Sequence, residues 1–178
     1  MAEEKKKRGK RAYLNDFYQD VSGKYVYRGK MYSYDGPLPR KSALGRAWLY
    51  TGVAAAALLA NGFVPNPALN GCFYVVIPYV LGLIAACSTA WALGRITAAG
   101  EQLRAYVYEE TAQQLPMRCT LALIGSAAGA AGQILYLLLH GLQQGWGLML
   151  VFLAFQIAAT VALYKLKQFK FETFWRIL

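Results

Sequence analysis

The sequence predicts an all-α integral membrane protein with four membrane-spanning helices arranged as two hairpins. Two observations carry this prediction. Hydrophobic residues make up 57% of the 178 residues, and residues 47–94 and 119–164 contain no Lys, Arg, Asp or Glu. A spanning helix needs about 20 apolar residues, so each uncharged stretch has room for two helices and a short turn. Helices of soluble proteins instead alternate polar and apolar stripes.

Residues 1–46 form a segment before the first span. The first eleven residues carry six basic groups and few apolar ones, so we expect a disordered tail. Its basic groups are either solvated or bound to anionic lipid headgroups, and nucleic acid is not an expected partner beside a membrane anchor. The predicted headgroup contacts of the tail are Lys5, Lys6, Lys7 and Arg8.

The segment Lys24–Asp35, KYVYRGKMYSYD, is predicted to form a short tyrosine-rich hairpin. A turn centred on Gly29 and Lys30 would place four tyrosines on one face, with Tyr25 opposite Tyr34 and Tyr27 opposite Tyr32. Because an isolated hairpin is marginal in water, it would need a surface to lie against. The alternative is a juxtamembrane linker without fixed structure.

The transmembrane domain, residues 47–164 with its flanking helix ends, follows from the uncharged stretches. Turn-forming residues divide each stretch, Pro65–Gly71 in the first and His140–Gly145 in the second. The predicted spans are 44–64, 72–94, 119–139 and 146–164, with a loop at 95–118. Arg40 and Lys41 form a basic collar in contact with headgroups, and Trp48 is a predicted interface anchor.

The loop 95–118 is predicted to contain a helix from Gly100 to Gln114, because its apolar residues recur at helical spacing. A third strand around residues 106–108 is a less favoured alternative. After the fourth span, residues 165–178 place Phe171, Phe174, Trp175 and Leu178 at helical spacing. This pattern predicts an amphipathic helix in the membrane plane, or a docking helix for a protein partner. In the membrane-plane interpretation the anchors are Phe171, Phe174 and Trp175, and the headgroup contacts are Lys167, Lys170 and Arg176.

Within the spans, small and amide side chains indicate helix packing. Gly125, Gly129 and Gly132 form a stripe of small residues on the third span, and Gly52, Ala56 and Ala60 form a similar ridge on the first. Whether these surfaces pack within one chain or between chains stays open. Gln133 and Gln156 lie at similar depths and are predicted to face one another and fix the helix register.

The distribution of basic residues predicts the orientation. All 19 Lys and Arg residues lie in residues 1–46, 95–118 or 165–178, and none lies in the two hairpin turns. The positive-inside rule therefore places both termini in the cytoplasm and makes this a multi-pass protein of the plasma or cytoplasmic membrane.

The stretches 47–94 and 119–164 contain no charged residue and the chain has one histidine, so neither an embedded catalytic cluster nor a cofactor or metal site is expected. The favoured hypothesis is a non-enzymatic accessory or interaction subunit of a membrane complex, in contact with lipid headgroups and a protein partner. The alternative is a small homo-oligomeric transporter or channel for a neutral or cationic solute, lined by polar residues of the spans: Tyr79, Ser88, Thr89, Gln133 and Gln156.

Overall fold

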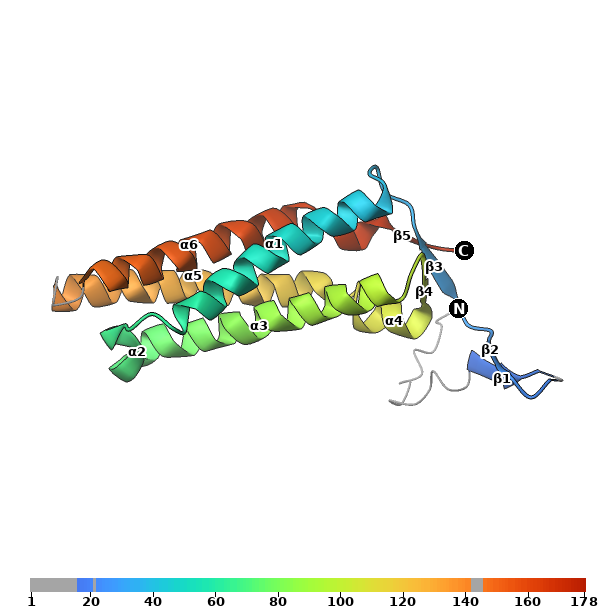
Figure 1. Cartoon of the computed structure of the whole chain (residues 1–178), viewed down its shortest axis with the longest axis horizontal. Helices are drawn as coiled ribbons and strands as arrows, with labels where there is room; N and C mark the ends of the chain where they lie inside the picture. Colours follow the sequence, from blue (N-terminus) through green and yellow to red (C-terminus); the bar gives the residue numbers. More distant parts are fainter. Residues whose placement is uncertain (1–15, 21, 142–145) are drawn as a thin grey trace, which may run out of the picture.

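The computed structural model describes residues 16–20, 22–141 and 146–178. Four long helices run alongside one another as an elongated bundle (Figure 1). They are α1 (Arg40–Asn61), α3 (Phe73–Ala98), α5 (Leu115–His140) and α6 (Trp146–Gln168). All four are long and apolar enough to cross a membrane, so the chain is a multi-pass membrane protein.

The predicted spans match these helices, and the difference between them is systematic. Each helix extends four residues beyond its predicted span at the same end of the bundle, where α1 begins, α3 ends, α5 begins and α6 ends. The extensions carry Arg40, Lys41, Arg95, Arg118, Lys165 and Lys167. The reason is that the absence of charge marks only the part of a helix that lies in the hydrocarbon core, whereas the helix itself continues into the headgroup region.

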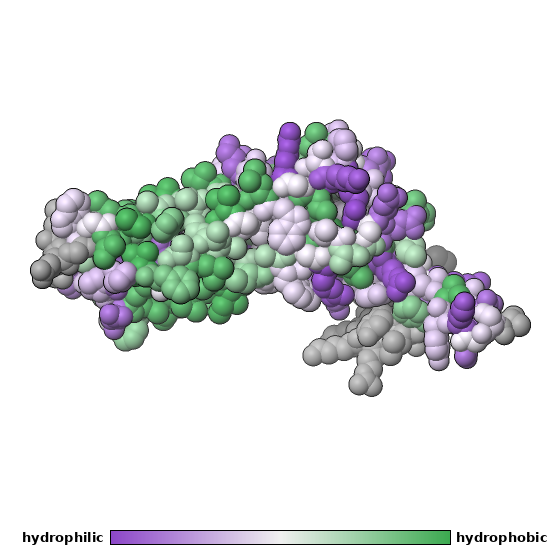
Figure 2. Space-filling view, in the orientation of Figure 1, coloured by the Kyte–Doolittle hydropathy of each residue, from purple (hydrophilic) through white to green (hydrophobic). Residues whose placement is uncertain are grey.

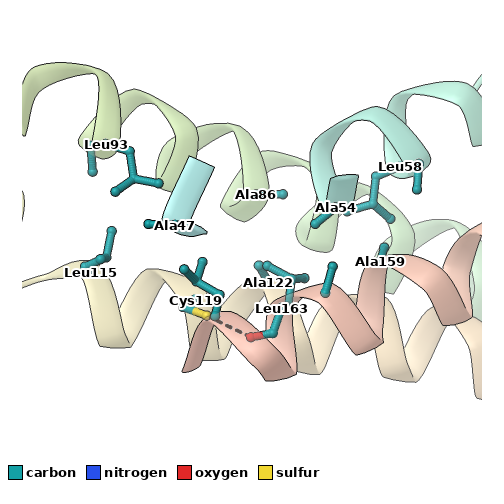
Figure 3. Packing of buried hydrophobic residues seen from close by; sticks show 14 of the residues in the cluster. Ala47, Ala54, Leu58, Ala86, Leu93, Leu115, Cys119, Ala122, Ala159 and Leu163 are labelled. Atoms are coloured by element: carbon teal, nitrogen blue, oxygen red, sulfur yellow. Dashed lines mark hydrogen bonds between the residues drawn. The ribbon is translucent and has the colours of Figure 1, made fainter. Parts of the chain in front are cut away.

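Small side chains fill the centre of the bundle. Helix α3 packs on α5, α1 packs on α6 and α3, and α5 packs on α6. Figure 3 shows alanines from all four helices meeting leucines there, with Ala54, Ala86, Ala122 and Ala159 fully buried. The Cys119 thiol, also buried, donates a hydrogen bond to the Leu163 carbonyl across 3.4 Å. Small residues let helix backbones approach closely, which supplies van der Waals contact where no hydrophobic effect operates.

At one end of the bundle, the turn between α1 and α3 contains a one-turn helix, α2 (Pro67–Gly71). Pro67 occupies the first helical position, and the Asn66 side chain accepts a hydrogen bond from the Ala68 amide (3.1 Å). This is a normal helix start, because proline lacks the amide hydrogen that would be unpaired there and asparagine caps the next one. We call this end of the molecule the turn end.

At the opposite end, three segments far apart in sequence assemble into a structure that we call the cap. Its antiparallel sheet has the order β4-β3-β5, with β3 (Met31–Tyr34) between β4 (Gln102–Arg104) and β5 (Trp175–Ile177). The short helix α4 (Ala105–Glu110) follows β4, and a 3₁₀ turn, η2 (Phe171–Phe174), precedes β5. Figure 1 shows the cap beyond the helix ends, with a separate hairpin of β1 (Phe17–Gln19) and β2 (Tyr25–Tyr27) projecting past it.

The predicted strand residues are confirmed, but their predicted pairing is wrong. Strand β2 pairs with β1 in the register Phe17 opposite Tyr27, whereas β3 pairs with β4 and β5. Tyr27 and Tyr32 therefore lie in different sheets. A hairpin of Lys24–Asp35 would give β3 one partner, whereas the cap gives it a partner on each side and half-buries its side chains.

The C-terminal amphipathic helix is also wrong. The helix does not continue after α6, because Lys170 adopts a left-handed conformation with a φ of 47°, and the chain then forms η2 and β5. Two backbone bonds beside β3 hold it there, from Asp35 to the Phe174 carbonyl (2.7 Å) and from Leu178 to the Met31 carbonyl (3.0 Å). Spacing i, i+3 suits a 3₁₀ turn as well as an α-helix, and the nearby strand supplies the remaining hydrogen bonds. Similarly, the helix predicted for 100–114 is confined to α4, because residues 102–104 pair with β3.

Candidate functional site

Aromatic side chains from all three segments form the interior of the cap. Tyr32 stacks on Tyr108, with ring centroids 4.0 Å apart. The ring of Tyr34 lies against those of Phe171 and Trp175, with centroid distances of 6.0 and 5.7 Å. Phe171 and Trp175 are 1% and 6% exposed, so these two of the four predicted interface anchors are instead core residues of the cap, and Phe174, a third, is half-buried against Tyr34. Because aromatic rings bury large areas, these contacts hold the three segments together.

The β1–β2 hairpin joins the cap through Tyr27. Its hydroxyl accepts a hydrogen bond from the Ala105 amide (3.1 Å) and donates one to the Lys30 carbonyl (3.3 Å). The Arg104 guanidinium lies over the rings of Phe17 and Tyr27 at 5.7 and 5.6 Å. Burial raises the pKa of Tyr27 above its usual value, although the Ala105 hydrogen bond acts in the opposite direction. The phenol therefore stays neutral and keeps both hydrogen bonds at physiological pH.

The rest of the hairpin presents aromatic and basic side chains to its surroundings. Tyr18, Tyr25 and Val26 are 46%, 75% and 38% exposed, and Arg28 lies 6.0 Å from the Tyr18 ring. Exposed tyrosine beside arginine is the composition found at the energetic centres of protein interfaces. We call Tyr18, Tyr25, Val26 and Arg28 the hairpin surface.

Three arginines form a layer where the helices meet the cap. Arg40 donates to the Ile96 carbonyl (3.0 Å), Arg95 pairs with Glu110, and Arg118 donates to Ser88 Oγ (2.6 Å). Arg40 belongs to the predicted collar. Arg95 and Arg118 were not among the predicted contacts, although both are the charged residues that border uncharged stretches, and that position is the signal that would have identified them.

The other predicted headgroup contacts lie at the cap end or outside the described residues. Lys5, Lys6, Lys7 and Arg8 lie outside them. Lys41, Lys167 and Lys170 are exposed at the cap end, and Arg176 pairs with Asp35 across 3.0 Å while remaining 76% exposed. The predicted anchor Trp48 is 37% exposed and donates to Thr97 Oγ1 (3.0 Å). Figure 2 shows hydrophilic residues concentrated over this end and an apolar surface along the helices.

A second candidate site is the polar core near the turn end. The predicted contact between Gln133 and Gln156 is wrong, because each glutamine bonds to an asparagine instead. Asn61 Nδ2 donates to Gln156 Oε1 (3.1 Å), and Asn66 Nδ2 donates to Gln133 Oε1 (2.8 Å). All four side chains are at least 96% buried. The sequence places Asn66 in the turn between the first two spans, and its hydrogen bond attaches that turn to α5.

Several atoms of the polar core have no hydrogen-bond partner. They are Gln133 Nε2, Gln156 Nε2 and Asn61 Oδ1. Unpaired buried amides are costly, so they mark places where water or a neutral polar solute would be stabilised. The proposed lining residues Tyr79 and Thr89 instead donate to the Leu58 and Ala85 carbonyls, and Ser88 bonds to Arg118.

The predicted packing glycines lie at contacts of α5 with its neighbours. A Cβ on Gly125 would lie 2.6 Å from the Cα of Gly82, one on Gly129 would collide with the Gln156 amide, and one on Gly132 would collide with the Tyr74 carbonyl. Pro78 lacks the amide hydrogen that this carbonyl would accept in a regular helix, which leaves the carbonyl free to approach Gly132. The ridge on α1 differs, because Gly52 and Ala56 are exposed.

Among the described residues, no three His, Cys, Asp or Glu side chains form a group that could hold a metal ion. In comparisons with known proteins, the chain matches no family model, no curated protein sequence and no solved structure.

Proposed function

We propose that this protein is a non-enzymatic interaction subunit of a membrane complex, anchored by four spans, with the cap and both termini in the cytoplasm. The observation that carries the proposal is the convergence of three described segments at the cap end. Segments from before α1, between α3 and α5, and after α6 build one cap, from which the hairpin surface projects. The cap holds this exposed aromatic and basic hairpin in place beside the membrane. The hairpin is therefore suited to bind a protein partner.

The charge distribution supports the proposed orientation. Basic residues border the spans at the cap end, and the turn between α1 and α3 has none. The positive-inside rule then assigns the cap to the cytoplasm, in the plasma or cytoplasmic membrane. Exposed Lys41, Lys167 and Lys170 are positioned to contact anionic headgroups there.

The test is the intact mass of the full-length protein purified from its native membranes in mild detergent. We expect a stoichiometric second polypeptide with the wild type and its loss in a variant with Tyr25→Ser and Val26→Ser. Leu178→Ser is the matched control, because Leu178 is 68% exposed at the same end but lies outside the hairpin. A homo-oligomer without a second polypeptide, or a partner retained by the double variant, would contradict the proposal.

The polar core favours a second candidate function, transport of a small neutral solute. The unpaired amide groups of Gln133 and Gln156 are hydrogen-bond donors aimed into the bundle. Liposome flux of neutral solutes would test it, with Gln156→Leu expected to abolish flux. The same substitution leaves partner binding intact if the protein is an interaction subunit, so the two functions are distinguishable.

A further inference from the structure

An apolar groove lies between α3 and α5 on the outside of the bundle. Its volume is about 460 Å³, within the range of ligand sites in proteins. Leu81 and Ile84 form one wall and Leu121 and Ile124 the other, each more than half exposed, while Gly125 leaves space between them. Since both helices are membrane spans, the groove faces the lipid tails.

The length of the groove matches one leaflet of a bilayer. It runs along α5 from Arg118 to Ala128 and along α3 from Ser88 to Pro78. Ten residues of helix rise about 15 Å. The hydrocarbon core of a bilayer is about 30 Å thick, so the groove extends from the headgroup region at the cap end to the bilayer centre.

The cap end of the groove is closed by a fixed positive charge. The Arg118 guanidinium donates to the Ser88 hydroxyl (2.6 Å), the Glu110 carbonyl (3.1 Å) and the Gln114 amide oxygen (3.0 Å), and it lies 5.5 Å from the Trp91 ring. These hydrogen-bond acceptors are all uncharged, and the bonds leave out the Nε–H group. The ion pairs among the described residues are Arg95 with Glu110 and Arg176 with Asp35, so no carboxylate there neutralises Arg118.

We propose that this groove binds an anionic glycerophospholipid of the cap-side leaflet, with one acyl chain along the groove and the phosphate beside Arg118. The positive charge of Arg118, at the depth of the headgroups, fits the phosphate, and the apolar walls fit the acyl chain. Arg118 is already held in place, so the phosphate binds without ordering a flexible side chain. Trp91, 52% exposed next to Arg118, lies at the headgroup level that tryptophan prefers. The proposal holds whichever side of the membrane the cap faces.

The experiment measures lipid retention by native mass spectrometry of the full-length protein. Phosphatidylglycerol and phosphatidylcholine with identical acyl chains are added at equal concentration. We expect about fivefold higher retention of phosphatidylglycerol, the effect of one basic group near a headgroup. Arg118→Gln should reduce this preference to about one and Arg118→Lys should keep it. Lys24→Gln, which removes an exposed basic group of the hairpin outside the groove, is the matched control and should leave the preference unchanged.

Because Arg118 also joins α5 to α3, a second pair of variants tests the groove itself. Ala128→Phe fills its deep end without changing any charge, and should reduce retention of both lipids. Ala127→Phe, exposed on the same helix but outside the groove, should not.

Four results would overturn the proposal. The first is equal retention of both lipids by the wild type, and the second is unchanged preference in a folded Arg118→Gln protein. The third is displacement of phosphatidylglycerol by inorganic phosphate with no effect of Ala128→Phe, which would indicate binding of the headgroup alone. The fourth is a dimer that excludes lipid and is broken by Ala128→Phe, which would make a second copy the occupant.

Discussion

At the scale of single residues, Tyr34 combines packing with an unpaired polar atom. Its ring contacts three aromatic side chains of the cap, but its hydroxyl is buried against Gly36 without a hydrogen-bond partner. A buried unpaired hydroxyl costs about 1–3 kcal/mol. Tyr34→Phe keeps the ring and should therefore leave the cap equally stable or up to about 1 kcal/mol more stable. Urea unfolding followed by the fluorescence of Trp175, with Trp48, Trp91 and Trp146 replaced by Phe in both proteins, measures this. A clear loss of stability would mean that the hydroxyl has a partner such as water.

Tyr34 and Tyr27 also predict how the cap responds to alkaline pH. Burial raises the pKa of both phenols above 10.0, so the folded state favours the neutral form. The stability that this contributes is fully present below pH 10 and is lost as the pH rises through the folded-state pKa values. Hydrogen exchange of the cap amides in detergent, compared between pH 9 and pH 11 after correction for intrinsic rates, should show the cap opening before the spans. Equal protection of the cap at both pH values would contradict this.

Gly125 and Gly52 are a matched pair of helical glycines with opposite surroundings. A Cβ on Gly125 would meet backbone atoms of Gly82 at 2.6 Å and the Pro78 carbonyl at 3.0 Å, and backbone cannot rotate away as a side chain can. A Cβ on Gly52 would meet nothing within 4 Å. We expect Gly125→Ala to destabilise the bundle by about 1–3 kcal/mol and Gly52→Ala to have no such cost. Thermal unfolding in detergent tests both. An equal loss at Gly52 would show that its exposed face packs against another copy.

At the scale of elements, the sequence predicted the features that depend on local composition. It did not predict the pairing of strands, which depends on segments far away in the chain. The four spans needed only absence of charge and length, so their centres were correct. The strand character of Tyr25–Tyr27 and Met31–Tyr34 was also readable. Their partners were not, because β3 pairs with strands about 70 and 140 residues away in sequence. No local pattern states which edges will meet once the helix ends are brought together.

The same reason explains the two errors of site prediction. Phe171 and Trp175 have the spacing of a membrane-facing helix, but a strand partner and the ring of Tyr34 were available to bury them. Gln133 and Gln156 lie at similar depth, but depth alone does not give rotation about the helix axis. Instead, Asn61 at the end of α1 bonds to Gln156, and Asn66 in the turn bonds to Gln133.

Among the residues of the turn end, Asn66 should contribute most to stability, because it connects two elements. Its Oδ1 accepts from the Ala68 amide and its Nδ2 donates to Gln133, so one side chain starts α2 and attaches it to α5. Asn66→Ala should cost about 1–2 kcal/mol. The exposed Asn70, on the same short helix, is the control and its replacement by alanine should be neutral.

A double-mutant cycle separates the two roles of Asn66. Combining Asn66→Ala with Gln133→Ala should give a coupling energy of about 0.6 kcal/mol, typical of polar contacts between membrane helices. The rest of the free energy of unfolding that Asn66→Ala removes is then the contribution of the N-cap hydrogen bond to the Ala68 amide. Strictly additive thermal stabilities would contradict the hydrogen bond between Asn66 and Gln133.

At the scale of the whole molecule, the cap closes only when the complete chain is in place. Strand β3 precedes α1, β4 lies between α3 and α5, and β5 follows α6, so the sheet needs all four spans to bring its strands together. The cap thus links both ends of the chain across the helix ends and fixes the base of the β1–β2 hairpin. A hairpin supported in this way can present its surface in one orientation, which reduces the entropy lost on binding.

The orientation of the whole molecule is its most directly testable property. If basic residues are retained in the cytoplasm, the cap end lies inside and the turn end outside. In a variant with Cys72, Cys87 and Cys119 replaced by alanine, single cysteines are introduced at Asn70 in the turn end or at Ser22 in the hairpin, both exposed. A membrane-impermeant maleimide added to intact cells should label Asn70→Cys, whereas Ser22→Cys should react only after permeabilisation. The cysteine-free protein must stay unlabelled in both conditions. The reverse pattern would place the cap outside and remove cytoplasmic partners from the proposed function, while leaving the lipid groove to be tested in the other leaflet.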